Sequence, residues 1–312
     1  MRIASIDLGT NTFNLLIADI SGNTINLVHR DKRGVKLGRN GINRHTICPD
    51  AWQRGMDALK DYSKDIEKYN PDKVIATATS AMRNADNGVE FVNTALETTG
   101  ISIQIIDGKE EARLIFEGVK NALPLYEEPS LIMDIGGGSI EFIIADNAGI
   151  IWHNSFEAGA SRLLEQFSPS EPILENEIKA IENHAENQLH ELFTKTEKYK
   201  PQILIGSSGS FDAIANMASF IINNYGIDIS SKYFEIPCDI YNKIHLLILK
   251  SDLEQRKKIP GMDLIRVELI VIGSILINFV INKLSVKKLI QSSYAIKEGV
   301  IFDAVQKNLK QI

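Results

Sequence analysis

The stretch LIMDIGGGSIEFIIAD at residues 131–146 starts as an apolar strand, breaks at three consecutive glycines and then resumes as an apolar strand. Glycine within a strand usually marks a bend or a place where another group comes close to the backbone. The pattern predicts two strands joined by a tight turn that contains Gly136, Gly137 and Gly138. We therefore expect another chemical group to lie against the backbone of this turn.

A second copy of this stretch lies at the N-terminus. After a shift of 127 residues, SIDLGTNTFNLLIAD (5–19) aligns without a gap with IMDIGGGSIEFIIAD (132–146), which pairs Asp7 with Asp134 and Gly9 with Gly136. A supersecondary unit used twice indicates two related domains. A length of 312 residues also favours two domains, because single cores rarely grow beyond about 250–300 residues.

The two turns have the chemistry of anion-binding loops. Backbone N–H groups in such turns can surround an anion, and hydroxyl groups can assist them. A nearby carboxylate would repel a bare phosphate, so Asp7 and Asp134 are better explained as ligands of a divalent cation or a water. Two ordinary hairpins with solvated aspartates are the alternative. The predicted phosphate contacts are Gly9, Thr10, Asn11, Thr12, Gly136, Gly137, Gly138 and Ser139.

The rest of the chain reads as α/β. Strands are predicted at 74–80, 101–107 and 287–293, and helices follow from about Ala81, Gly108 and Tyr294. Residues 173–198 are predicted to form one long amphipathic helix, and the apolar run 269–281 a buried helix. The stretch 123–130 contains two prolines and is the best linker candidate.

A third glycine-containing loop follows the predicted strand QILIG at 202–206 and opens a helix. Free N–H groups and the positive end of a helix dipole favour anions. This loop therefore predicts a third phosphate or nucleotide contact, made by Gly206, Ser208, Gly209 and Ser210.

Composition limits the class of protein. The formal net charge is −6, which argues against wholesale binding to nucleic acid or anionic membranes. Cys48 and Cys238 are expected to be reduced, and the histidines lack the spacing of a zinc site. The N-terminus does not read as a signal peptide, so we expect a cytoplasmic protein.

Seven segments occur in the order found in one known family and cover nearly the whole chain. The chain resembles the exopolyphosphatase and guanosine pentaphosphate phosphohydrolase (Ppx/GppA) family, within the actin-like superfamily of sugar kinases and Hsp70. The EEAR motif at 110–113 and the DIGGGS-x-E motif are specific to the family. The segments are 5–17, 78–87 (ATSAMRNADN), 108–119 (GKEEARLIFEGV), 134–142, 158–163 (AGASRL), 206–210 (GSSGS) and 292–301 (SSYAIKEGVI).

This resemblance implies two actin-like (ribonuclease H-like) α/β domains with the active site in a central interdomain cleft. Domain I is expected at 1–124 plus about 295–312 and domain II at 125–294, with hinges near 123–130 and 290–296. The length matches a short form of the family that consists of these two domains alone. Oligomeric state is left open, and a homodimer is one alternative.

The implied activity is Mg²⁺-assisted release of terminal phosphate from inorganic polyphosphate, or of the 5′ γ-phosphate of guanosine pentaphosphate. Glu111 matches the position that activates the attacking water. Glu141 and Asp134 match positions at the metal and water, with Asp7 as a further metal candidate. The cation is expected to be Mg²⁺ or another divalent ion.

Two basic features of the sequence, Arg83 and the segment 29–45, each have two interpretations. Arg83 either binds a phosphate or is a surface arginine. The segment 29–45 has six Lys or Arg and one acidic residue, which suits a track for polyphosphate or an ordinary charged edge strand. Arg30, Arg33, Lys36 and Arg39 alternate imperfectly, so no face is assigned to them.

Two other functions are compatible with the loops. An ATP-dependent small-molecule kinase on the same scaffold would need an acceptor site with an aspartate base, which the sequence does not reveal. An actin-like nucleotide or phosphate sensor or assembly module would need no catalytic glutamates. Neither alternative explains the EEAR segment, so the phosphatase interpretation is favoured.

Overall fold

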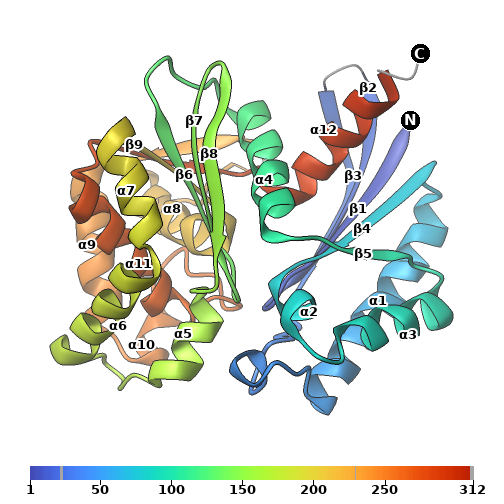
Figure 1. The fold of residues 1–312 in the computed structure, drawn as a ribbon, viewed down its shortest axis with the longest axis horizontal. Coiled ribbons are helices and arrows are strands. Elements are labelled where there is room, and N and C mark those ends of the chain that lie inside the picture. Colours follow the sequence, from blue (N-terminus) through green and yellow to red (C-terminus); the bar gives the residue numbers. More distant parts are fainter. Residues whose placement is uncertain (22–23, 229, 310–312) are drawn as a thin grey trace. The chain divides into compact units, whose positions relative to one another are not determined.

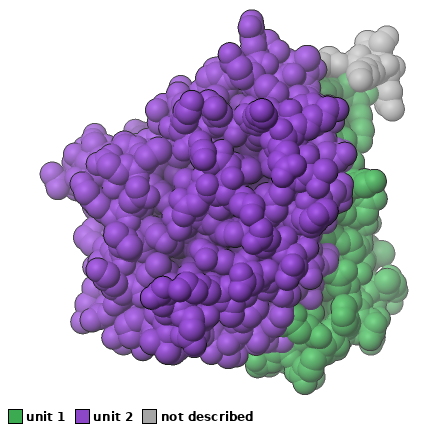
Figure 2. All heavy atoms as spheres, turned by 60° about the vertical axis from the view of Figure 1, so that its left-hand side comes forward, with its two compact units in different colours: residues 1–118, 296–312 green, residues 119–295 purple. Residues whose placement is uncertain are grey.

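A computed structural model describes residues 1–21, 24–228 and 230–309 (Figure 1). The chain forms two compact units, which Figure 2 shows as spheres: unit 1 is Met1–Gly118 with Ile296–Ile312, and unit 2 is Val119–Ala295. The boundaries expected from the sequence lie at 124/125 and 294/295. The compact units divide at 118/119, inside helix α4 (Gly108–Ala122), and at 295/296.

Unit 1 is built on a mixed sheet with the order β3-β2-β1-β4-β5. β1 runs antiparallel to β2 and parallel to β4, which makes the repeated hairpin the antiparallel half of the sheet. The strands are β1 (Arg2–Leu8), β2 (Phe13–Ser21), β3 (Thr24–Arg33), β4 (Lys73–Ala78) and β5 (Ile103–Ile105). The helices are α1 (Pro49–Tyr69), α2 (Ser80–Asn84), α3 (Gly88–Thr99), most of α4 and α12 (Ile296–Leu309), with a 3₁₀ turn at Ile42–Arg44.

Strand alternation sends the two faces of β1 to different cores. Ala4, Ile6 and Leu8 belong to the core that includes Leu59 of α1 and Phe91 of α3. Ile3 packs with Ile301 of α12, which lies against β1 and β2 although it comes from the end of the chain (Figure 1). Because side chains alternate along a strand, Asp7 shares the face of Ile3.

Unit 2 repeats the arrangement with one additional strand, in the order β10-β11-β9-β6-β7-β8. Its strands are β6 (Ser130–Ile135), β7 (Ile140–Asp146), β8 (Gly149–Phe156), β9 (Ile203–Ser207), β10 (Tyr233–Ile236) and β11 (Lys288–Ser292). Its helices are α5 (Ala160–Phe167), α6 (Glu175–Gln188), α7 (His190–Tyr199), α8 (Ser208–Asn223), α9 (Cys238–Lys250), α10 (Leu253–Arg256) and α11 (Ile270–Leu284).

The structure confirms the internal repeat down to single hydrogen bonds. The N–H of Gly9 donates to the carbonyl of Thr12 over 3.0 Å, and the N–H of Gly136 donates to that of Ser139 over the same distance. The pairing with the third strand shifts after Ile17 in unit 1 and after Ile144 in unit 2, again 127 residues apart. The two hairpins therefore share turn, register and bulge.

Two helix predictions have different outcomes. The buried helix at 269–281 is confirmed as α11, whose side chains lie in the core of unit 2. The single helix at 173–198 is wrong, because α6 and α7 are separate and meet at Leu189, which is fully buried. No proline or glycine marks this break, so burial of Leu189 in the core is the only visible reason for it.

Two further features of the described residues bear on the class of protein. None of the helices in the described part of the chain is long and apolar enough to cross a membrane. Cys48 and Cys238 are both free thiols, as expected from the sequence.

Candidate active site

The glycine turn of unit 2 lies against the first turn of α5. The carbonyls of Gly136, Gly137 and Gly138 accept hydrogen bonds from backbone N–H groups of residues 159–162 over 2.8–3.2 Å. A Cβ atom on Gly159 would lie 2.5 Å from backbone atoms of Gly137 and Gly138, so only glycine fits there. The group that approaches the glycine run is therefore, in part, the chain's own backbone.

This contact leaves the N–H side of the turn available. Within residues 1–21, 24–228 and 230–309, the N–H groups of Gly137, Gly138 and Ser139 donate to no other backbone carbonyl. A turn can bind an anion when several consecutive backbone N–H groups do not donate to carbonyls of the protein. The geometry thus fits the phosphate contact predicted for this loop.

The equivalent turn of unit 1 is held by a different segment. The carbonyl of Thr10 accepts from the N–H of Gly38 over 3.0 Å, and that of Asn11 from Lys36 over 2.8 Å. The side-chain Nδ2 of Asn11 is buried, with the residue 5% exposed, and has no hydrogen-bond partner among the described residues. An unsatisfied buried donor is costly unless a ligand or water accepts from it, which favours an acceptor bound at this loop.

A row of polar side chains crosses the unit 2 sheet at the base of its turn. Asp134 lies opposite Glu141 on β7 and opposite Ser207 on β9, and Glu141 lies opposite Ser155 on β8. Asp134 is 5% exposed and Glu141 1% exposed, so two carboxylates are buried as immediate cross-strand neighbours. Two adjacent buried charges of the same sign require a compensating cation or proton.

Hydroxyl groups hold these carboxylates in place. Oδ2 of Asp134 accepts from the Oγ atoms of Ser207 and Ser208 over 2.6 and 2.7 Å. Oε1 of Glu141 accepts from Oγ of Ser155 over 2.6 Å. These hydroxyl groups fix the orientation of both carboxylates.

The same row in unit 1 has a different charge. Asp7 lies opposite Asn14 and Thr77, and Asn14 lies opposite Lys32. The amide Nδ2 of Asn14 donates to Oδ2 of Asp7 over 3.0 Å. Asn14 thus occupies the position of Glu141, and one carboxylate and one ammonium replace the carboxylate pair.

The row of unit 2 fits a divalent cation that takes its remaining ligands from water and substrate. Mg²⁺ is usually bound by one or two carboxylates together with waters and phosphate oxygens. Asp134 and Glu141 supply two carboxylates side by side. No group of three or more His, Cys, Asp or Glu with metal-binding geometry exists in the described part of the chain, so a closed site made only of protein ligands is not present there.

Glu111 lies in the first turn of α4 and is 7% exposed. Its Oε2 accepts from Nη1 of Arg83 over 2.9 Å, and the same Nη1 donates to the carbonyl of Ile106. Arg83 is therefore partly exposed, with 17% of its side chain accessible, and is paired with Glu111. The ion pair fixes the Glu111 carboxylate; phosphate binding by Arg83 stays a prediction.

The neighbouring Glu110 takes part in structural contacts within unit 1. Nε of Arg113 donates to Oε2 of Glu110 over 2.7 Å, and Nη1 of Arg113 to Asp303 of α12 over 2.9 Å. The two carboxylates raise the pKa of the Arg113 guanidinium well above its ordinary value, with the hydrogen bond to Glu110 as the largest cause. Glu110 thus belongs to an α4–α12 bridge within unit 1, whereas Glu111 does not.

The third loop follows β9 and is joined to the carboxylate row. Ser208 has a left-handed backbone with φ of 69°, which is uncommon for a residue with a side chain, and its hydroxyl contacts Asp134. Gly206 lies under the ring of Phe211, Gly209 under the guanidinium of Arg266, and Ser210 against Gly273. These packing contacts account for Gly206 and Ser210 without a ligand, and phosphate binding by this loop stays a prediction.

The basic residues of segment 29–45 differ in their contacts and in their exposure. Arg33 pairs with Asp31 over 2.7 Å and with Asp61 over 2.5 Å, and Arg44 donates to the carbonyl of Asn40. Arg30 and Lys32 are exposed and, two residues apart on β3, point to the same face of the sheet. These two residues form the basic edge, the name used below.

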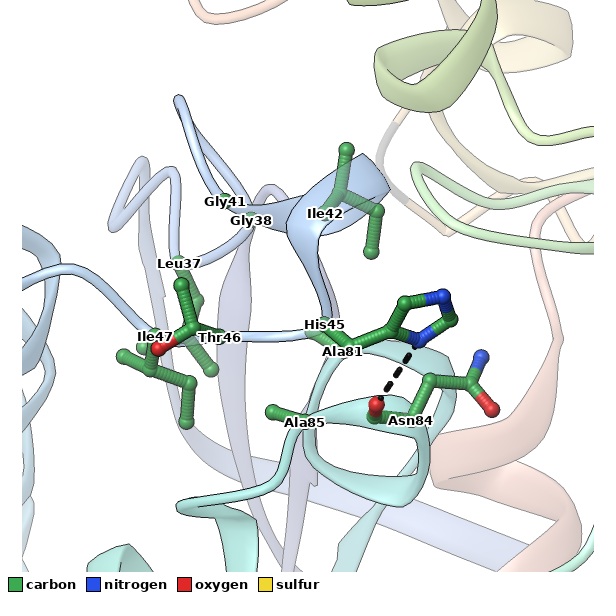
Figure 3. Close-up of a pocket in the computed structure, with 10 residues that line it drawn as sticks. All are labelled: Leu37, Gly38, Gly41, Ile42, His45, Thr46, Ile47, Ala81, Asn84 and Ala85. Atoms are coloured by element: carbon green, nitrogen blue, oxygen red, sulfur yellow. Dashed lines mark hydrogen bonds between the residues drawn. The ribbon is translucent and has the colours of Figure 1, made fainter.

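The same segment lines a small hollow in unit 1, drawn in Figure 3. Leu37 and Ile47 lie on one side and Ile42 lies above, while the ring of His45 lies beside Asn84, whose carbonyl contacts Nδ1 over 3.1 Å. None of the predicted catalytic, phosphate or metal residues lines it, so we assign it no part in the site.

Sequence reasoning missed several members of the two rows. Ser155, Ser207 and Thr77 are hydroxyl residues of strands, and the strand pairing brings each of them beside a carboxylate. Asn14 could have been found, because the shift of 127 residues aligns it with Glu141. Arg162, discussed below, lies in a segment quoted only for its resemblance.

Comparison with known proteins identifies close relatives of this arrangement. A family model described as the Ppx/GppA phosphatase family matches residues 16–308. A Haemophilus influenzae protein, provisionally described as an exopolyphosphatase, is 27% identical over 309 residues, which cover 99% of this chain and 93% of the relative.

Two solved structures share the whole architecture. The crystal structure of an exopolyphosphatase from Cytophaga hutchinsonii is 34% identical, with a TM-score of 0.95 and 98% of each chain covered. The Ppx/GppA family member from Aquifex aeolicus is 25% identical, with a TM-score of 0.81, and the match covers 99% of this chain and 98% of that one. The two-sheet α/β architecture is therefore the two-domain actin-like fold expected from the sequence.

Proposed function

The chain belongs to the Ppx/GppA phosphatase family, and from this premise we propose that it releases terminal phosphate from inorganic polyphosphate. The 5′ γ-phosphate of guanosine pentaphosphate, which has the same kind of phosphoanhydride bond, is the second candidate substrate. The observation that carries the proposal is the pair of matching anion loops, one of which lies directly above two buried carboxylates. The exopolyphosphatases among the relatives support the choice of polyphosphate.

The loops supply the positioning that phosphoryl transfer requires. Such reactions depend mainly on holding the phosphate and stabilising charge on its oxygens. In the proposal, the N–H groups of the unit 2 turn and the hydroxyl of Ser139 bind phosphate oxygens, and the unit 1 turn does the same with the amide of Asn11. Mg²⁺ or another divalent cation at Asp134 and Glu141 would supply charge neutralisation.

Glu111 is proposed to orient and deprotonate the attacking water. A carboxylate can accept the proton late in the reaction, when the water has become acidic. The ion pair with Arg83 holds the carboxylate in one orientation. Fixed orientation of the base favours reaction because it removes rotational freedom before the chemical step.

The basic edge is proposed to contact the body of a polyphosphate chain. Lys32 ends the polar row that contains Asp7 and Asn14, and Arg30 lies next to it on the same face. Local cations attract a polyanion that the net charge of −6 would otherwise repel. Guanosine pentaphosphate has no such extended chain, so this edge would favour polyphosphate.

The experiment that tests the proposal is release of inorganic phosphate with Mg²⁺ from long-chain polyphosphate, guanosine pentaphosphate and ATP. We expect release from polyphosphate and a loss of about 10³-fold or more in kcat for Glu111→Gln. Glu117→Gln is the matched control, because Glu117 is also buried on α4 and accepts from Gln306. Folded protein that releases no phosphate from any substrate, or equal losses in both variants, would contradict the proposal.

A further inference from the structure

Arg162, in the first turn of α5, is a buried cation that contacts the glycine turn of unit 2. The residue is 9% exposed; its Nε donates to the carbonyl of Gly138 over 3.0 Å, and its Nη2 pairs with Oε2 of Glu157 over 2.6 Å. A cation is unfavourable at the N-terminal end of a helix, because the helix dipole is positive there. The helix itself therefore does not favour a cation at this position, and the side chain is directed instead to the Gly138 carbonyl and to Glu157.

The Gly138 carbonyl decides where a neighbouring N–H points. In a trans peptide the carbonyl and the N–H of the next residue point in opposite directions. Because the carbonyl of Gly138 points to Arg162 and α5, the N–H of Ser139 points away from them. The same reasoning applies to the carbonyls of Gly136 and Gly137, which accept from α5, and so to the N–H groups of Gly137 and Gly138.

Arg162 contributes a side-chain donor to the hydrogen bonds that the three turn carbonyls accept. The other donors to the three carbonyls, in the described part of the chain, are backbone N–H groups. At Gly138 the backbone bond, from the N–H of Gly159, is the longer of the two at 3.2 Å. Hydrogen bonds from a charged donor are roughly twice as strong as neutral ones, so the guanidinium dominates the orientation of this peptide.

We propose that Arg162 is a positioning residue of the unit 2 phosphate loop: anchored by Glu157, it holds the Gly138 peptide so that the Ser139 N–H faces the bound phosphate. The proposal rests on the proposed function in that it takes phosphate as the ligand of the loop. A purely structural role, in which Arg162 only attaches α5 to the sheet, predicts lost stability with unchanged phosphate binding.

The test compares Arg162→Met and Arg162→Lys with Arg2→Met. Arg2 is a matched control, because it too donates to a backbone carbonyl, that of Tyr69, and pairs with a carboxylate, that of Asp19. The readouts are kcat and KM for phosphate release, Kd for inorganic phosphate by calorimetry, and Tm.

We expect Arg162→Met to lower kcat by about 30- to 100-fold, as small misplacements of binding groups do. Its Kd for inorganic phosphate should rise by about 10-fold, because the Ser139 N–H is no longer held facing the phosphate. Arg162→Lys should recover part of both values, because an ammonium can reach one of the two acceptors. Arg2→Met should lower Tm and leave kcat and Kd unchanged.

Two outcomes overturn the proposal: an Arg162→Met protein with a lower Tm but wild-type kcat and Kd, or a wild-type protein that binds no inorganic phosphate. The Kd remains informative if no phosphate is released from any substrate, so failure of the proposed function is separable from failure of the positioning role. If Arg162→Met does not fold, Glu157→Gln replaces it, because the half-exposed Glu157 can lose its charge at smaller cost. Glu157→Gln should, like Arg162→Met, lower kcat and raise Kd. Unchanged values would overturn the proposal.

Discussion

The two hairpins share the same backbone geometry but carry different patterns of charged side chains. Both turns close with a 3.0 Å hydrogen bond from a glycine, and both direct turn carbonyls to a neighbouring segment. That segment is the loop at Lys36–Gly38 in unit 1 and the start of α5 in unit 2. Different sequences therefore reach the same presentation of backbone N–H groups, which indicates that this presentation is the shared requirement.

The side chains around the turns diverge. The unit 1 row contains Asn14 and Lys32 where the unit 2 row has Glu141 and Ser155. Two residue pairs further along, β3 carries Arg30 where β8 carries His153. We infer a division of tasks: unit 2 offers negative charge to a cation, and unit 1 offers positive charge to a polyanion.

The largest expected effect separates the two aligned aspartates. Asp134→Asn should lower the rate of phosphate release by about 10³-fold, because it removes one of the two carboxylates proposed to bind the cation. Asp7→Asn should cost about 10-fold, because Asp7 already accepts from the amide of Asn14 and has no second carboxylate opposite it. Steady-state rates at saturating Mg²⁺ check both values, and equal losses would remove the contrast.

A second, smaller effect concerns the segments that hold the turns. Gly159→Ala should lower activity by about 10²-fold and stability by about 2 kcal/mol, because its Cβ would lie 2.5 Å from backbone atoms that cannot move aside. Gly38→Ala should cost less, because its Cβ would meet Cγ2 of Thr10, a side-chain atom, at 2.5 Å.

Rescue distinguishes the two cases. Thr10→Ser removes the methyl group and keeps the hydroxyl, so it should restore activity to Gly38→Ala. No substitution of a side chain can restore Gly159→Ala in this way. Rates and urea unfolding of the single and double variants test this, and a Gly159→Ala protein with wild-type activity would refute the backbone contact.

The basic edge should give an effect that depends on chain length. Arg30→Ala with Lys32→Ala should raise KM for long-chain polyphosphate by about 5- to 10-fold, because two charge contacts with the chain are lost. Short chains such as tripolyphosphate should show less than about 2-fold change. Added salt should weaken the difference, since it screens exposed charges.

Lys60→Ala with Lys64→Ala is the matched control, because these exposed lysines of α1 pair with Asp57 and Asp61 of their own helix. Its KM values should stay at wild type for all chain lengths. A rise in KM that is equal for long and short chains in the Arg30 and Lys32 variant would mean that the edge does not contact the chain body.

The smallest effect on activity, but a measurable one on stability, comes from a buried imidazole of unit 2. Burial lowers the pKa of His245 to about 4, while Nδ1 contacts Oγ of Ser274 over 2.7 Å. The unfolded chain binds this proton below its ordinary pKa of 6.5 and the folded chain does not, so stability falls as pH drops from 6.5 towards 4. The expected loss between pH 7.5 and 5 is about 2 kcal/mol.

This loss should appear in the unfolding of unit 2, which contains His245. Each unit contains one tryptophan, Trp52 or Trp152, so Trp→Phe variants let urea unfolding be followed in one unit at a time. His245→Asn should remove most of the extra loss in unit 2. If it leaves the pH dependence unchanged, another group is responsible.

The sequence predicted what depends on local pattern and repetition. The hairpins, the turn glycines and helix α4 with Glu111 in its first turn follow from periodicity and from the alignment of 5–19 with 132–146. It did not predict the partners of these residues. Strand pairing brings Ser155 to Glu141, and tertiary packing brings Arg83 to Glu111, and neither contact has a signature in linear spacing. The break at Leu189 was missed for the same reason.

The most direct test of the division of tasks is phosphate release from polyphosphate as a function of Mg²⁺ concentration, for wild type, Glu141→Gln and Asn14→Ala. Glu141→Gln should need at least about 10-fold more Mg²⁺ for half-maximal rate, because one of two adjacent carboxylates is lost. Asn14→Ala should keep the wild-type Mg²⁺ requirement. Equal Mg²⁺ requirements in all three proteins, or a larger shift for Asn14→Ala, would contradict the assignment of the cation to unit 2.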